Sequence, residues 1–202
     1  MEFFGVDLVA LIKAIGYIGV FTIVFAETGL FLGFFLPGDS LLFVAGFLSS
    51  QGYFSLPILM LSLFFAGVIG NIFGYEFGRR VGPKLFSRDD SIIFKKAHAL
   101  KAQAFYDRHG PKTIVLARFM PIVRTFAPIV AGVANMHYRT FLIYNIAGSL
   151  LWTFGLLILG YSLGSVIDVD RYLLPIVLLI VVLSFLPGII SFLREKYGKR
   201  DQ

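Results

Sequence analysis

Four charged residues lie within or beside long apolar stretches of the chain, namely Glu27, Asp39, Arg118 and Arg124. A charge at membrane depth costs at least about 2.5–3.5 kcal/mol, so these side chains are expected to face one another rather than lipid. The arginines offer planar forks of donors that suit a phosphate group. The carboxylic acids can bind and release protons in a low-dielectric cavity. Together they predict a site for an anionic head group and a proton; the alternative is a buried salt-bridge lock.

The spacing within each pair argues against two straight helices. The acidic pair is twelve residues apart, about 120° around a helix, and the arginine pair is six apart, about 240°. Neither pair therefore shares a helix face, but Pro37 separates the acids and Pro121 separates the arginines. We predict that the chain bends at both prolines and brings the four charges together, with Pro37, Asn71 and Pro121 lining the cavity.

The composition places these charges in a membrane protein. Of 202 residues 57% are hydrophobic and only 15% charged, against about 25% charged in soluble domains, and the mean hydropathy is +0.83. There is no cysteine, which excludes disulfides and thiolate chemistry. The histidines, His98, His109 and His137, are too scattered for a ligand cluster. We therefore predict no metal, no cofactor and no enzymatic activity.

The apolar segments predict an all-α membrane protein with about four transmembrane helices and two re-entrant hairpins. About 20 apolar residues suffice to cross a bilayer. The predicted spans are Leu8–Ala26, retained and not cleaved as a signal, then Ser55–Gly78, Phe141–Gly164 and Tyr172–Leu193.

Two further apolar segments, Glu27–Leu48 and Thr113–Met136, are predicted to begin and end on one membrane face. Each carries helix-breaking residues in its middle: Leu36-Pro37-Gly38 in the first, and Pro121 and Pro128 in the second. Broken backbone at membrane depth is tolerated only where protein or water satisfies it. We expect the two hairpins to enter from opposite faces and meet, as in inverted-repeat transporters.

The distribution of charge predicts the orientation. Residues 79–112 hold nine Lys or Arg and three Asp, a net charge of +6. Because these residues bracket apolar spans, the positive-inside rule explains them better than binding to nucleic acid. We expect this connector and both termini to be cytoplasmic, and the Ser49–Phe54 turn and the Asp168–Arg171 loop to lie outside. The chain is then one membrane domain, with a first half (1–78), the connector, a second half (113–193) and a basic tail (194–202).

Two other features have packing explanations. Glycines recur every four residues at Gly70, Gly74, Gly78 and Gly82, which predicts close approach of a neighbouring helix. Trp152 lies in the middle of a predicted span and is expected to be a packing aromatic.

Several motifs accompany the four charges in chain order over roughly residues 15 to 165. They are Glu27-Thr28-Gly29, Leu36-Pro37-Gly38-Asp39, Gly70-Asn71-Ile72-Phe73-Gly74-Tyr75-Glu76-Phe77-Gly78-Arg79, Phe105-Tyr106-Asp107-Arg108-His109-Gly110, Ala117-Arg118-Phe119-Met120-Pro121-Ile122-Val123-Arg124-Thr125, and Ala131-Gly132 with Phe141, Asn145 and Trp152 downstream. This set resembles the DedA family, bacterial relatives of the VTT-domain lipid scramblases of eukaryotes. Asn71 differs, since family members often carry Asp there.

The resemblance implies a multi-pass protein of the bacterial inner membrane that supports envelope homeostasis. It implies a proton-motive-force-linked flippase of an anionic lipid, undecaprenyl phosphate or a phospholipid. Glu27 and Asp39 would then be the family's acidic pair, and Arg118 and Arg124 its basic pair. Two alternatives remain open: an antiporter that exchanges a small cation such as Na⁺ for protons by means of the carboxylates, and, more remotely, an intramembrane lipid phosphatase. The sequence also leaves a homo-oligomer open.

Overall fold

The computed structural model describes residues 2–3, 6–30, 38–85, 106 and 110–166. A two-residue ladder of β1 (Glu2–Phe3) with β2 (Val6–Asp7) precedes the helices. Within the described residues the helices are α1 (Leu8–Gly29), α2 (Gly38–Ser50), α3 (Leu56–Leu85), α5 (Lys112–Ala117), α6 (Pro121–Val133) and α7 (Tyr138–Val166).

Three of these helices are long and apolar enough to cross a membrane: residues 12–29, 56–82 and 138–166. They correspond to the first three predicted spans, with ends that differ by a few residues. The outward face of α3 carries a stripe of exposed apolar side chains at helical spacing, which suits contact with lipid rather than water. That stripe is Ile58, Leu61, Phe65, Ile69, Phe73 and Phe77. The fourth predicted span, residues 172–193, lies outside the described residues.

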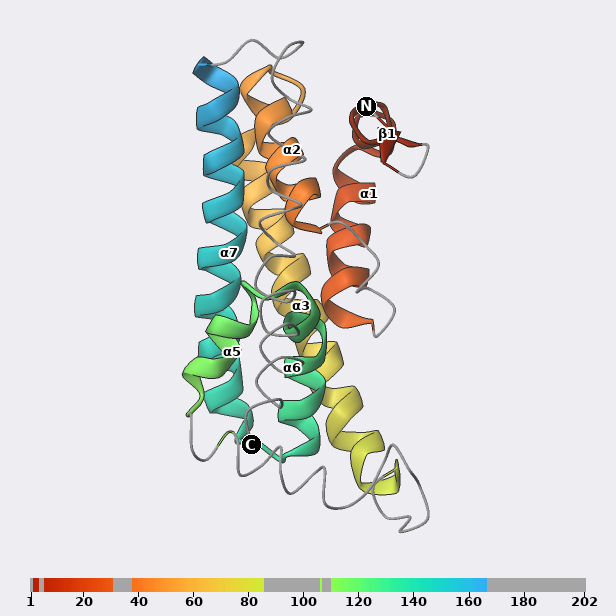
Figure 1. The fold of residues 1–202 in the computed structure, drawn as a ribbon, viewed down its shortest axis with the longest axis vertical. Coiled ribbons are helices and arrows are strands. Elements are labelled where there is room, and N and C mark those ends of the chain that lie inside the picture. Colours follow the sequence, from red (N-terminus) through yellow and green to blue (C-terminus); the bar gives the residue numbers. More distant parts are fainter. Residues whose placement is uncertain (1, 4–5, 31–37, 86–105, 107–109, 167–202) are drawn as a thin grey trace, which may run out of the picture.

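The long helices α3 and α7 run the height of the bundle, and two pairs of shorter helices pack against them (Figure 1). In the figure, α1 and α2 flank the upper part, and α5 and α6 flank the lower part. The packing separates into two apolar clusters. One is centred on residues such as Phe47, Leu59 and Trp152, and the other on Tyr75, Ile114 and Phe141.

The first broken hairpin differs from the prediction in its limits. The sequence predicted that the first span ends at Ala26 and that Glu27 begins a separate hairpin. Instead α1 continues through Glu27 to Gly29, where Gly29 lies against Gly70 in the middle of α3. Since α2 then starts at Gly38, α1 and α2 themselves form the broken pair.

The prediction for the membrane face at which α1 begins is therefore wrong relative to the α2–α3 turn. The start of α1 was expected on the face opposite the α2–α3 turn. In the structure the Lys13 ammonium lies 3.8 Å from the centroid of the Tyr53 ring, and the Tyr17 hydroxyl accepts from the Ser55 amide at 2.6 Å. The chain goes into the bundle along α1 and returns to the same end along α2. The wrong prediction came from treating an apolar helix of sufficient length as a complete crossing.

The α2–α3 turn and the end of α7 were both predicted to lie at the outer face, and the structure places them together. Gln51 Nε2 donates to the Gly164 carbonyl at 2.8 Å.

In the second broken pair the break falls after α5, and Pro121 begins α6. Pro128, expected to break the helix as well, lies inside continuous α6. Its missing amide donor is tolerated because α6 packs closely on α3.

The last three glycines of the run form this close contact, and Gly70 faces Thr28 of α1 instead. Gly74 lies 3.6 Å from Pro128, measured from the position that a Cβ would take, and Gly78 and Gly82 face Ile129 and Val133. Small residues let the α3 and α6 backbones approach directly.

Replacement of Gly78 by alanine is expected to destabilise the protein by about 1–3 kcal/mol, because the new methyl group collides with the Ile129 carbonyl. Thermal unfolding in detergent measures the effect. Gly155→Ala is the matched control, since nothing lies within 4 Å of a methyl group there. Equal stability of the two variants would contradict the close packing.

Candidate functional site

The two broken pairs meet at a buried ion cluster. Arg124 donates through Nη1 to Asp39 Oδ1 and through Nη2 to Glu27 Oε1. Glu27 is fully buried, Arg124 is 7% exposed, and the Asp39 side chain is 17% exposed. One guanidinium therefore bridges a carboxylate at the end of α1 and another at the start of α2. Each fork arm holds a different acid, which a single-point cation would not reproduce.

The ends of the helices set the positions of the acids. Asp39 lies in the first turn of α2, where the positive end of the helix dipole favours a carboxylate. Glu27 is the third-last residue of α1, with its Oε2 against Gly38. A side chain at position 38 would occupy the space of the Glu27 carboxylate, so glycine is required there.

Trp152, from the midpoint of α7, belongs to the same cluster. Its Nε1–H donates to Asp39 Oδ1 at 2.7 Å, and the indole is 2% exposed. The guanidinium carbons of Arg124 and Arg118 lie 5.1 and 5.6 Å from its ring centroid. These distances are within the range of cation–π attraction. Trp152, which the sequence predicted to be a packing aromatic, therefore also donates a hydrogen bond and lies within cation–π distance of both arginines.

Arg118 has a different set of partners from Arg124. It caps the end of α5, and its Nη2 donates to the Gly67 carbonyl at 3.0 Å and to Asn145 Oδ1 at 2.9 Å. No carboxylate lies within ion-pair distance of it among the described residues. The prediction that both arginines pair with the acids is thus met by Arg124 alone.

The amide of Asn71 completes the surroundings of Arg118. Asn71 and Asn145 contact each other at 3.0 Å between α3 and α7. With its oxygen toward Arg118, Asn71 accepts from Nη2 at 2.8 Å and donates to the Thr28 carbonyl at 3.2 Å. Asn145 also donates to the Val68 carbonyl at 3.1 Å. Buried charge is tolerated here because neutral dipoles solvate the guanidinium.

Asn71 therefore lies beside Arg118. The structure gives no side-chain contacts for the other two residues that were predicted to line the cavity, Pro37 and Pro121. Pro37 lies outside the described residues, and Pro121 is described only as the first residue of α6.

Asn145 and Trp152 are functional candidates that the sequence did not single out for the site. The available signal was the presence of an amide and an indole side chain, seven residues apart, in a span without a charged residue.

Replacement of Trp152 by phenylalanine is expected to cost about 1.5–3 kcal/mol of unfolding free energy, because the donor to the Asp39 carboxylate is lost while a ring remains. Tyr161→Phe removes a polar group from an exposed position of the same helix and is expected to be neutral. Chemical or thermal unfolding in detergent distinguishes them. An unchanged Trp152→Phe protein would reduce Trp152 to a space-filling role.

Comparison with known proteins assigns the class. The chain matches the VTT domain over residues 36–162. It is 45% identical to Protein DedA of Escherichia coli (strain K12) over 182 residues, 89% of this chain and 83% of that protein. It is 42% identical to an uncharacterized membrane protein of Mycobacterium leprae over 180 residues, covering 89% and 79% of the two chains. No solved structure matches significantly.

A more distant relative is the inner membrane protein YqjA of E. coli (strain K12), 32% identical over 193 residues, 91% of this chain and 87% of that protein. The apolar helices and these matches define a membrane protein. It belongs to the DedA family of VTT-domain proteins.

Proposed function

We propose that this protein moves an anionic lipid across the membrane together with protons, the lipid being a polyprenyl phosphate such as undecaprenyl phosphate or a phospholipid. The observation that carries the proposal is the buried Arg124 held by Glu27 and Asp39 where the two broken helix pairs meet. A structural bridge needs one acid for one arginine. Two ionised acids on one guanidinium leave a net negative charge, which the binding of one proton neutralises.

The exchange follows from the charges. A phosphate and the two carboxylates compete for the same donors of Arg124. Protonation of one carboxylate removes its attraction for the guanidinium and frees a fork arm for the phosphate. The lipid head group and the proton therefore bind together, and their charges offset each other within the low-dielectric interior. Arg118, solvated by amides and carbonyls instead of acids, supplies a second positive charge beside that position.

The arrangement of the helices suits movement through the bilayer. We infer that α1–α2 and α5–α6 are re-entrant hairpins that reach the charged cluster from opposite membrane faces, as in inverted-repeat transporters. YqjA is named an inner membrane protein, and we place this chain in the bacterial inner membrane with residues 79–112 facing the cytoplasm. It acts as a transporter and not as an enzyme.

Reconstitution into liposomes tests the proposal. Fluorescent undecaprenyl phosphate or phospholipid in both leaflets is exposed to a membrane-impermeant quencher, with and without an imposed pH gradient. Lipid should become accessible faster with the protein, faster still with the gradient, and a protonophore should remove the gradient's effect. Protein-dependent collapse of the gradient by Na⁺ or K⁺, without lipid movement, would instead establish the antiporter. Empty liposomes and the Arg124→Ala protein are the controls.

A further inference from the structure

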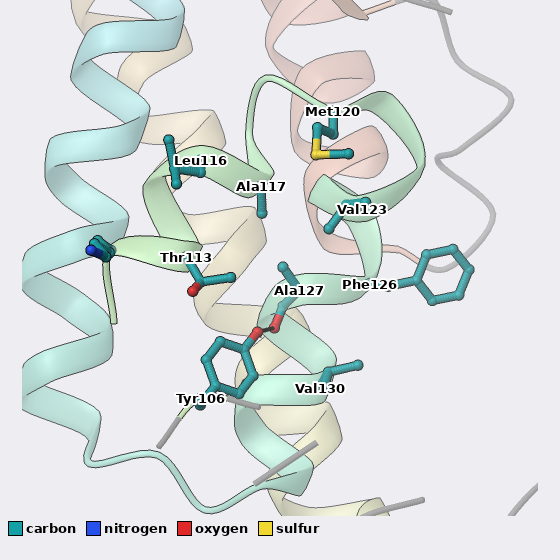
Figure 2. Close-up of a pocket in the computed structure, with 10 residues that line it drawn as sticks. Tyr106, Thr113, Leu116, Ala117, Met120, Val123, Phe126, Ala127 and Val130 are labelled. Carbon is teal, nitrogen blue, oxygen red and sulfur yellow. Dashed lines mark hydrogen bonds between the residues drawn. The ribbon is translucent and has the colours of Figure 1, made fainter. Parts of the chain in front are cut away.

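An apolar groove lies between α5 and α6, on the same hairpin that carries the two arginines. Its volume is about 560 Å³, within the roughly 300–1,000 Å³ typical of ligand sites. Thr113 and Ala117 of α5 face Ala127 of α6 across it, with Tyr106 at one end and Met120 at the other (Figure 2). Its remaining lining residues are Lys112, Leu116, Val123, Phe126 and Val130.

The walls of the groove present carbon, because its polar groups bond within the protein. The Tyr106 hydroxyl donates to the Ala127 carbonyl at 2.9 Å, and the Thr113 hydroxyl donates to the Gly110 carbonyl at 2.9 Å. Leu116 and Val123 remain 61% and 37% exposed. Such a surface favours a hydrocarbon chain and offers little to a polar solute.

The groove lies beside the membrane-crossing part of the bundle. Val115 of α5 packs against Gly148, the eleventh residue of the 29-residue helix α7. Lys112, at the start of α5, is the one charged residue among those lining the groove. Ala117 and Val123, which also line it, immediately precede Arg118 and Arg124 in the sequence, although neither arginine lines the groove. The groove therefore carries a single positive charge at one end and is formed by the same hairpin that holds the two arginines.

We propose that this groove is the loading site for a lipid monophosphate with one hydrocarbon chain: the chain lies between α5 and α6, and the phosphate contacts Lys112. The inference rests on the proposed function for the identity of the lipid. Charge complementarity selects an anionic head group, and a single groove accommodates one chain where a phospholipid carries two. The head group would move from Lys112 along the hairpin to the arginines during transport.

Binding of undecaprenyl phosphate to the purified protein in detergent tests the site independently of transport. The lipid is expected to raise the unfolding temperature of the native protein more than neutral undecaprenol does. Val123→Trp, which fills the groove from an exposed position, should weaken the affinity by about tenfold or more, equal to about 1.4 kcal/mol. Ala127→Leu provides a second, smaller filling. Lys112→Gln should remove the preference for the phosphate over the alcohol.

Leu151→Trp is the control, because Leu151 is 55% exposed on α7 and does not line the groove. Unchanged affinity in a folded Val123→Trp protein would overturn the site and leave the transport proposal standing. Equal competition by phosphatidylglycerol would overturn the one-chain assignment. A disulfide between single cysteines at Val123 and within residues 86–105 would show that the chain itself covers the groove. If the native protein binds undecaprenyl phosphate in the groove but does not transport it in liposomes, the proposed function is overturned and the groove assignment stands.

Discussion

Replacement of Arg124 by lysine is expected to leave the protein folded and to remove most lipid transport, by about tenfold or more. Lysine keeps the positive charge between Glu27 and Asp39, so the buried acids stay compensated. It lacks the planar fork whose two arms reach the two acids and, on the proposed mechanism, one phosphate. A lost charge-assisted hydrogen bond is worth about 1.5–3 kcal/mol, equivalent to roughly 10–100-fold.

Arg124→Ala is expected to behave differently, with a loss of about 3–5 kcal/mol of stability, because it leaves fully buried Glu27 without its cation. Transport per folded molecule and unfolding temperature, measured on both variants, separate the two effects. Arg80→Lys is the control, since the Arg80 side chain is 80% exposed and pairs with Glu76 on its own helix. A folded Arg124→Lys protein with near-normal transport would mean that the cluster is a structural lock.

The cost of isolated charge in an apolar segment explains what the sequence could predict. Glu27, Asp39 and Arg124 had to be compensated within the protein, and the other carboxylate in a predicted span, Glu76, lies at the end of that span beside the basic connector. Their meeting therefore followed from composition and from breaks near Pro37 and Pro121. The glycines at four-residue spacing predicted the close approach of a neighbouring helix, without indicating that this helix is α6.

The surroundings of Arg118 could not be predicted in this way. A guanidinium can be satisfied by carbonyls and amides as well as by acids, and backbone acceptors such as the Gly67 carbonyl carry no signal in the sequence. Trp152 presents the same difficulty, because its large apolar ring is favoured in any packed span. The path of α1 was wrong because length and hydropathy measure whether a helix can cross a membrane. They do not indicate that it turns back.

The two carboxylates of the cluster are not equivalent. Asp39 accepts from both Arg124 and Trp152 and retains some exposure. Glu27 is fully buried, its Oε1 accepts from Arg124, and its Oε2 faces Gly38. Loss of charge at Glu27 therefore affects one side-chain donor among the described residues, Arg124, whereas loss of charge at Asp39 affects both Arg124 and Trp152. We infer that Glu27 carries the proton.

Glu27→Gln is accordingly expected to bind undecaprenyl phosphate tightly at every pH and to transport it slowly. In the native protein a fall in pH protonates Glu27, weakens its hold on Arg124 and strengthens binding of the anion. Glutamine imitates the protonated state permanently, so the pH dependence should disappear and the affinity at neutral pH should rise by roughly 10–100-fold, the value of a charge-assisted bond. Transport falls because glutamine cannot release a proton on the far side.

Lipid affinity measured by thermal shift across a pH series, for the native protein, Glu27→Gln and Asp39→Asn, checks this assignment. The Asp39→Asn protein is the matched comparison, since it also loses one negative charge next to Arg124 but should keep the pH dependence that Glu27 confers. If the slope of affinity against pH survives in Glu27→Gln and vanishes in Asp39→Asn, the proton is carried by Asp39. If it survives in both, neither acid couples the lipid to protons, and the cluster neutralises charge without exchanging it.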